Sequence, residues 1–192
     1  MGFPIKAWGP SLWELIHIVA LGYDNFPITK ERIIYYNLFF TTITKIIPCI
    51  KCKIHYYQYL RRRPVIKYLK NSDSLLRWVN DLHNSVNRKL RKKIVHYPES
   101  KKMFLDEKKN IKINKKICIF LDHYVKNMNS IRFIEFKKLF NILFKIFPCE
   151  ICRKKLIEYN SKNNINKTNK NSIKKWYNNL KLSNIINERL NS

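Results

Sequence analysis

Two segments of the chain place a proline directly before a Cys-x-x-Cys pair: IIPCIKCKIHYY at residues 46–57 and KIFPCEICRKKL at residues 145–156. Together they hold four of the five cysteines. Two intervening residues bring the sulfurs close enough for a small, readily reduced disulfide, as thiol–disulfide exchange requires. The pairs could instead supply four ligands to one zinc ion. Because 96 residues lie between them and each has its own helical context, the pattern favours redox disulfides.

Apolar periodicity predicts an all-α fold, and only 3 glycines and 7 prolines in 192 residues argue against a turn-rich β architecture. We expect helices over residues 11–22, 30–47, 49–62, 74–92, 117–127, 132–147, 149–159 and 172–190. Ser11 should cap the first helix, and Asp73 or Ser74 the fourth. The faces expected to be buried carry Leu12, Leu15, Ile16 and Val19 in the first helix, Ile33, Ile34, Leu38, Phe39 and Ile43 in the second, and Leu75, Val79, Leu82, Val86 and Leu90 in the fourth.

The second half of the chain repeats features of the first. Phe40, Pro48, Cys49, Cys52 and Tyr59 coincide with identical residues 100 positions later, and SLLRWVNDL at residues 74–82 matches SIKKWYNNL at residues 172–180. This self-similarity predicts a duplicated helical unit. We therefore divide the chain into a first domain at 1–98, a polar, basic linker at 99–116 and a second helical domain at 117–192.

The formal charge of +26 would suit a nucleic-acid-binding protein. However, the 29 lysines are spread along the whole chain, as an AT-rich genome would produce, so we expect a solvated surface and no nucleic-acid partner. The first ten residues lack the pattern of a signal peptide, and no apolar run is long enough to span a bilayer. These features predict a soluble, cytoplasmic protein, in which disulfides are usually transient and catalytic.

Two further segments carry the residue types that a flavin dinucleotide needs. WGPSLWELIH at residues 8–17 supplies aromatic rings and a histidine, and HNSVNRKLRKK at residues 83–93 supplies His, Asn and basic groups. Aromatic walls, hydrogen-bonding side chains and cations for a pyrophosphate make such a site plausible beside a Cys-x-x-Cys pair.

In this order the motifs resemble the Erv/ALR family of FAD-linked sulfhydryl oxidases, over about residues 5–98. The resemblance is carried by Trp8, Gly9, Pro10, Trp13, Ile16 and His17, by Cys49, Cys52 and His55, and by Trp78, His83, Asn84, Val86, Asn87, Leu90 and Lys92. Arg91 departs from the pattern, because the family usually has glycine there.

The resemblance implies a four-helix bundle with a short fifth helix that binds FAD. Cys52 would abut the flavin as the charge-transfer thiolate, and Cys49 would exchange with an incoming dithiol. The implied FAD-binding residues are Gly9, Trp13, His17, His55, Trp78, His83, Asn84, Val86, Asn87 and Lys92. Such an enzyme oxidises thiol-bearing proteins, for example a thioredoxin-like protein or a small Cys-x-x-Cys carrier, reduces O₂ to H₂O₂ and carries no metal.

For the second half, the resemblance implies a degenerate Erv-like domain. Lys181 and Leu182 replace the His-Asn pair, so we expect no FAD there. This half could serve as an intramolecular pseudo-dimer partner, the alternative being a homodimer. Cys149–Cys152 would be a structural or a shuttle disulfide, and Cys118 a buried thiol.

A family member without a signal peptide and with this composition suits a large DNA virus, acting in the host cytoplasm or packaged in the virion. The competing hypothesis is a basic, zinc-binding helical protein that binds nucleic acid and uses both Cys-x-x-Cys pairs as metal ligands.

Overall fold

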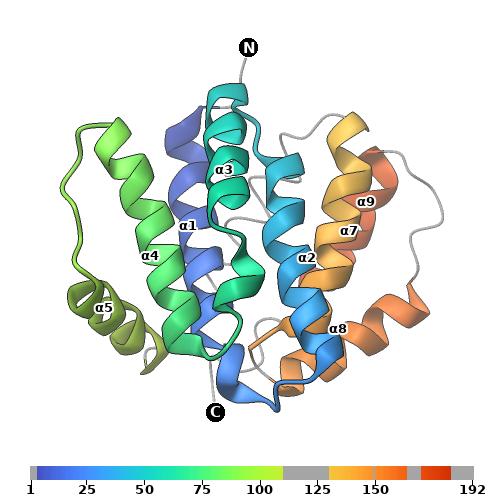
Figure 1. Ribbon diagram of the computed structural model, residues 1–192. Helices are drawn as coiled ribbons and strands as arrows, with labels where there is room; N and C mark the ends of the chain where they lie inside the picture. The colour runs from blue at the N-terminus through green and yellow to red at the C-terminus, as the bar shows by residue number, and fades with distance from the viewer. Residues whose placement is uncertain (1–3, 110–129, 149, 164–169, 183–192) are drawn as a thin grey trace.

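The computed structural model describes residues 4–109, 130–148, 150–163 and 170–182, and these ranges contain helices and no strand, which confirms the all-α prediction (Figure 1). The first half contains α1 (Ile5–Leu21), α2 (Lys30–Ile46), α3 (Ile50–Arg62), α4 (Ser72–Lys89) and α5 (Tyr97–Lys109), with short 3-10 turns η1 (Tyr23–Asn25) and η2 (Val65–Tyr68). The second half contains α7 (Ser130–Ile146), α8 (Glu150–Lys162) and α9 (Lys170–Leu182). None of the described helices is long and apolar enough to cross a membrane.

Helix α1 begins six residues before the predicted start, so Ser11 is not its N-cap. Pro10 lies inside the helix, where it removes one backbone hydrogen bond. The longer helix places Trp8 in the core with 5% of its surface exposed. Burial of this large ring favours the longer helix, although its indole N–H is buried without a partner among the described residues.

Helices α2 and α4 are each capped by a side-chain oxygen that accepts a hydrogen bond from a backbone amide of the first turn. Thr29 Oγ1 accepts a hydrogen bond from the Arg32 amide at 3.1 Å. Asn71 Oδ1 accepts one from the Ser74 amide at 2.8 Å, so the cap of α4 is Asn71 and not the predicted Asp73 or Ser74. Asp73 is unsuited to capping, because its carboxylate binds the side chains of Tyr97, Arg77 and Lys101.

The predicted buried faces are correct for α1 and for most of α4. In α4, Leu75, Val79 and Leu82 are fully buried, whereas Leu90 lies beyond the last helical residue and is exposed. In α2 the prediction is partly wrong. Ile34 and Leu38 are 56% and 40% exposed, and the buried residues are Arg32, Tyr36, Phe39, Phe40, Ile43 and Ile46. The cause is that α2 packs against α7 as well as against its own bundle, so two of its sides are covered.

The predicted linker is helical up to Lys109, and the rest of it lies outside the described residues. Helix α5 packs on α1 and α4. Its few apolar residues suffice because Tyr97 also binds α4, donating its hydroxyl to Asp73 Oδ1 at 2.7 Å. Helix α5 therefore adds a fifth helix to the bundle of the first half, while the division of the chain into domains stays a prediction.

The second half repeats the helix pattern of the first. Helices α7 and α8 have the bounds of α2 and α3 shifted by 100 residues. The aromatic contacts repeat too: ring centroids are 5.2 Å apart in Phe40–Trp78 and 5.4 Å apart in Phe140–Trp176. A tyrosine hydroxyl donates to the tryptophan carbonyl in both halves, through Tyr59 and Tyr159. These shared contacts support the duplication predicted from the sequence.

The halves meet along α2 and α7, which lie side by side in Figure 1. A second contact joins the end of α1 to the turn before α8. There Asn25 Nδ2 donates to the Pro148 carbonyl at 2.9 Å, and Gly22 approaches the Pro148 ring so closely that a Cβ on it would stand 2.6 Å from Pro148 Cβ. The guanidinium of Arg153 lies 3.9 Å from the Phe26 ring centroid. The interface therefore combines apolar packing, a hydrogen bond and a cation–π contact.

Candidate active site

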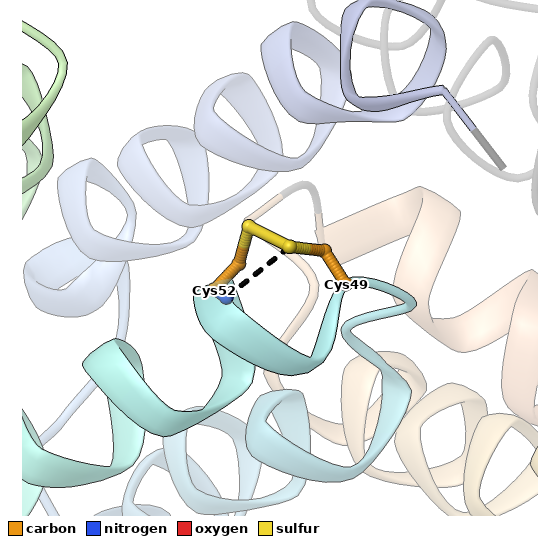
Figure 2. The surroundings of a disulfide bond; sticks show 2 residues. All are labelled: Cys49 and Cys52. Carbon is orange, nitrogen blue, oxygen red and sulfur yellow. Dashed lines mark hydrogen bonds between the residues drawn. A yellow bond between two sulfur atoms is a disulfide. The ribbon is translucent and has the colours of Figure 1, made fainter. Parts of the chain in front are cut away.

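Cys49 and Cys52 form a disulfide at the N-terminal end of α3 (Figure 2). Pro48 disfavours a helical conformation in the residue before it, so α2 ends at Ile46 and Ile47 is extended. Cys49 is then the N-cap of α3, and its Cα lies 5.2 Å from that of Cys52, a separation suited to a disulfide. The local sequence thus places both half-buried sulfurs at one helix end.

The surroundings of the disulfide favour a thiolate when it is reduced. The Cys52 amide donates to Cys49 Sγ at 3.2 Å, drawn as the dashed line in Figure 2. The positive end of the helix dipole lies at this position, and the first turn of α3 has no acidic residue. Lys51 and Lys53 add positive charge. These features lower the pKa of a cysteine thiol and make it a better leaving group.

A cluster of aromatic and imidazole rings joins α1, α4 and α5. The Trp13 and His83 rings stack at 4.1 Å with 7° between their planes. The His17 ring lies 5.4 Å from that of His83, and it stacks on Phe104 of α5 at 4.1 Å. The structure therefore brings together three of the predicted cofactor-binding residues, together with Phe104.

His17 presents a buried hydrogen-bond acceptor that has no partner among the described residues. Its Nδ1 bonds the Trp13 carbonyl at 2.8 Å, and a carbonyl can only accept, so Nδ1 carries the proton. Nε2 is therefore the bare nitrogen, and it is buried without a hydrogen bond. Such an atom is costly unless a ligand supplies a donor.

Both histidines of the cluster are neutral at physiological pH. Burial lowers the pKa of His17 to about 3, with a smaller contribution from the nearby His83. Burial and then the charge of Lys92 lower the pKa of His83 to about 4. Each ring can therefore accept a hydrogen bond through one nitrogen and stack through its face.

His55 lies between α3 and α4 with its tautomer fixed by a serine. The Ser85 hydroxyl donates to the Leu82 carbonyl at 2.7 Å and so accepts from His55 Nε2, which lies 2.9 Å away. The Nδ1 atom of His55 is then the unprotonated nitrogen. Partial burial, Lys89 and Arg62 lower the pKa of His55, which also favours the neutral ring.

Other predicted residues have structural partners. Trp78 is fully buried, its indole N–H donates to the Arg63 carbonyl, and its ring packs on Phe40 and Tyr59. Asn84 uses both ends of its amide on the backbone of Val95, at 2.8 and 3.1 Å. In this conformation the two side chains hold the bundle and the loop before α5, and they do not join the ring cluster.

The C-terminal end of α4 explains the departure at Arg91. Arg91 has φ 54°, the left-handed conformation that glycine adopts most easily. The Lys92 amide bonds the Asn87 carbonyl at 2.9 Å, and the Arg91 amide bonds the Arg88 carbonyl at 3.1 Å. This is a Schellman motif, so the helix ends as a glycine would end it and Lys92 keeps its place near His83. Val86 is half-buried one residue before Asn87.

The described residues fit a flavin dinucleotide. Stacked rings, the unpartnered His17 Nε2 and the cation of Lys92 are complementary to an aromatic, hydrogen-bonding, anionic ligand. Gly9 adds a second indication: it is buried, yet a Cβ there would meet only Ile5 Cγ2 at 3.4 Å, an ordinary contact. The protein's own packing does not require a glycine at this position, whereas a closely approaching ligand would.

The side chains of the second Cys-x-x-Cys pair and of Cys118 lie outside the described residues. Cys152 is described only as part of the α8 backbone. Among the described residues there is no group of three or more His, Cys, Asp or Glu side chains that could hold a metal ion. Cys49 and Cys52 are bonded to each other, which disfavours them as zinc ligands.

Sequence reasoning missed two side chains of the candidate site. Phe104 falls in the segment taken as a linker, although its spacing of seven residues from Tyr97 is helical and could have indicated a packed face. Ser85 stands between motif residues and carries no signal of its own. Its partnership with His55 depends on how α3 and α4 pack.

Comparisons with known proteins match the first half of the chain. The Erv1 / Alr family profile matches residues 10–108. A probable FAD-linked sulfhydryl oxidase of Acanthamoeba polyphaga mimivirus is 36% identical over 96 residues, which are 50% of this chain and 66% of that relative. An FAD-linked sulfhydryl oxidase of African swine fever virus is 32% identical over 97 residues, which are 50% of this chain and 79% of the viral protein. The mitochondrial FAD-linked sulfhydryl oxidase of Saccharomyces cerevisiae is 32% identical over 88 residues, which are 46% of this chain and 45% of the yeast protein. No solved structure matches the chain significantly.

Proposed function

The chain belongs to the Erv1/Alr family, and on that basis we propose that it is an FAD-dependent thiol oxidase acting through Cys49 and Cys52. The net reaction converts two protein thiols and O₂ into a disulfide and H₂O₂. The observation that carries the proposal is the Cys49–Cys52 disulfide, which caps α3 within the region that matches the family.

The disulfide oxidises the substrate by two exchange steps. A substrate thiolate attacks Cys49 Sγ, a bond forms between them, and the electron pair of the broken bond goes to Cys52 Sγ. The second substrate thiolate then attacks the substrate sulfur of the mixed disulfide. This step closes the substrate disulfide and releases Cys49 as a thiolate, which the Cys52 amide and the helix end stabilise.

The cofactor is held by the ring cluster and its neighbours. Trp13 and His83 offer ring faces, His17 Nε2 accepts a hydrogen bond, His55 offers Nδ1, and Lys92 supplies positive charge. When bound here, FAD would supply the two-electron chemistry that links the cysteine pair to O₂. His17 itself is 1% exposed, so its ring lies where water does not reach it.

The second half acts as an intramolecular partner of the first domain. Packing of α7 on α2, the Asn25–Pro148 hydrogen bond and the repeated tryptophan contacts support a pseudo-dimer over a homodimer through the same face. The side chains of Cys149 and Cys152 lie outside the described residues, and for them we keep the structural or shuttle disulfide that the sequence predicts. We also propose that the protein acts in the host cytoplasm or in the virion, with the viral origin of two relatives as support. A thioredoxin-like protein or a small Cys-x-x-Cys carrier suits the chemistry as substrate.

Oxygen uptake with dithiothreitol as electron donor tests the proposal. The FAD-loaded protein should consume O₂ and release H₂O₂, and Cys49→Ser and Cys52→Ser should each abolish turnover. Cys118→Ser is the matched control, which removes a thiol outside the motif and should leave the rate unchanged. Full activity in either motif variant would rule out this disulfide as the redox centre, and bound zinc without flavin would favour the metal-binding alternative.

A further inference from the structure

The outer face of α3 carries three large apolar side chains in water. Ile50, Ile54 and Tyr57 are 73%, 49% and 52% exposed. They stand at i, i+4 and i+7, so they share a helix face about 60° wide, at 3.6 residues per turn. We call these three residues the α3 stripe. Single exposed apolar residues are common, but three aligned on one helix form a patch that marks interaction surfaces.

The α3 stripe begins at the redox centre. Ile50 directly follows Cys49, and the stripe continues for about 10 Å along the helix, at a rise of 1.5 Å per residue. Tyr56, Tyr59 and Leu60 are buried on the other side of α3 and anchor it to the bundle. A partner lying along the stripe would therefore meet a rigid surface whose end is at the N-terminus of α3, next to Cys49 in the chain and on the opposite side of the helix from Cys52.

Positive charge surrounds the stripe. Lys51 and Lys53 lie on opposite sides of Ile54, and Arg61 continues the line of the stripe beyond Tyr57. No acidic residue occurs in Ile50–Arg62, and the whole chain has a formal charge of +26. A partner with negative charge would be attracted to this face and oriented by it, whereas a basic one would be repelled.

We propose that the α3 stripe is the docking surface for the thiol substrate, and that the substrate is a protein whose cysteine pair lies in an apolar segment bordered by Asp and Glu. This proposal rests on the thiol oxidase function and adds the class of substrate. Docking on the stripe supplies the affinity, and the lysines on either side select an acidic border. The substrate segment that carries the cysteines passes around the helix end at Ile50 to reach Cys49, because the disulfide lies on the side of α3 that also carries Tyr56.

Two synthetic peptides provide the test. Both carry one Cys-x-x-Cys pair in the same apolar sequence, and one has glutamates and the other lysines at the flanking positions. With the FAD-loaded full chain, kcat/KM for the acidic peptide should exceed that for the basic one by about tenfold at low salt, and the difference should shrink as salt screens the charges. Equal values for both peptides would overturn the proposed selectivity.

Variants of the stripe separate docking from chemistry. Ile54→Ser combined with Tyr57→Ser should lower kcat/KM for the acidic peptide about tenfold and leave dithiothreitol oxidation unchanged, because a small thiol needs no docking surface. Ile34→Ser is the matched control: Ile34 is 56% exposed on α2, twelve residues before Ile46, and so about 18 Å along the helix from the end nearest the disulfide.

The outcomes are distinguishable. Unchanged peptide oxidation in the stripe variant, or an equal loss in Ile34→Ser, would overturn the docking surface. A stripe variant that becomes monomeric while the wild type is dimeric would show that a second copy covers the stripe, which also overturns it. Failure of the wild type to oxidise dithiothreitol would instead refute the thiol oxidase function.

Discussion

Replacing Gly22 with alanine tests the packing of the two halves. Gly22 follows α1 with φ −82°, a conformation that alanine adopts without strain. A Cβ there would lie 2.6 Å from Pro148 Cβ, 2.8 Å from Pro148 Cγ and 3.2 Å from Pro148 Cα. Because Pro148 belongs to a turn between packed helices and its ring is rigid, it cannot yield as a flexible side chain would.

The expected magnitude follows from two opposed effects. A glycine-to-alanine change at an unstrained position stabilises by about 0.4–1 kcal/mol through the unfolded chain. Forcing a methyl group into an occupied site costs about 1–3 kcal/mol. Gly22→Ala should therefore lower the free energy of unfolding by about 0.5–2 kcal/mol net. For a chain of this size that shifts Tm down by about 1–8 °C.

Urea denaturation followed by circular dichroism measures the change, and a second variant assigns its cause. Pro148→Gly removes the two closest ring atoms, so in that background Gly22→Ala should lose most of its cost, with a coupling energy of about 1 kcal/mol or more. Gly9→Ala, measured without FAD, is the matched control and should stabilise by about 0.5–1 kcal/mol, because its Cβ meets only an ordinary contact. If Gly22→Ala stabilises as Gly9→Ala does, the halves do not pack through this contact.

Three other changes have defined outcomes. Arg91→Gly should stabilise the protein by less than about 1 kcal/mol and raise its urea midpoint, because it relieves a left-handed φ of 54° at a small entropic cost. A lower urea midpoint would contradict this. The free energy of unfolding should fall as pH drops from 6.5 towards 4. The pKa values of His17 and His83 in the folded protein lie below the value of an unfolded histidine, so the unfolded chain binds more protons in this range. Each histidine lowers the free energy of unfolding by up to about 1.4 kcal/mol per pH unit. A flat profile over pH 7 to 5 would refute the buried neutral rings. Tyr97→Phe removes the hydrogen bond to Asp73, so it should lower the free energy of unfolding by about 1 kcal/mol and speed amide hydrogen exchange in α5. Unchanged exchange would show that this bond does not hold the helix.

Helices buried on one side were predictable from the sequence. In α1 the residues Leu12, Leu15, Ile16 and Val19 form one stripe, and all are buried. The buried residues of helix α2 were not predictable in this way, because α7 covers a second side of this helix and its apolar residues no longer mark a single face. Arg32 shows this best: it is 7% exposed, although sequence alone would place an arginine in water. Its guanidinium donates to the carbonyls of Gly22 and Tyr23, which no local pattern predicts.

For the site, the sequence predicted residue types better than directions. The spacing of Cys49 and Cys52 determined the disulfide, since two intervening residues at a helix start leave the sulfurs adjacent. The motifs placed Trp78 and Asn84 at the cofactor, and this placement stays a prediction. The motifs did not indicate that Trp78 packs in the core or that Asn84 bonds the backbone of Val95. A motif states which residues occur together, whereas the direction of each side chain depends on how the helices pack.

The visible absorption spectrum of the purified full chain tests the central claim most directly. The protein should show a flavin band that dithiothreitol bleaches in the absence of air and that returns when O₂ is admitted, because FAD takes the electrons of the Cys49–Cys52 pair. In Cys52→Ser the band should be present and persist after dithiothreitol is added. A colourless wild-type protein that binds no FAD on reconstitution would contradict the account.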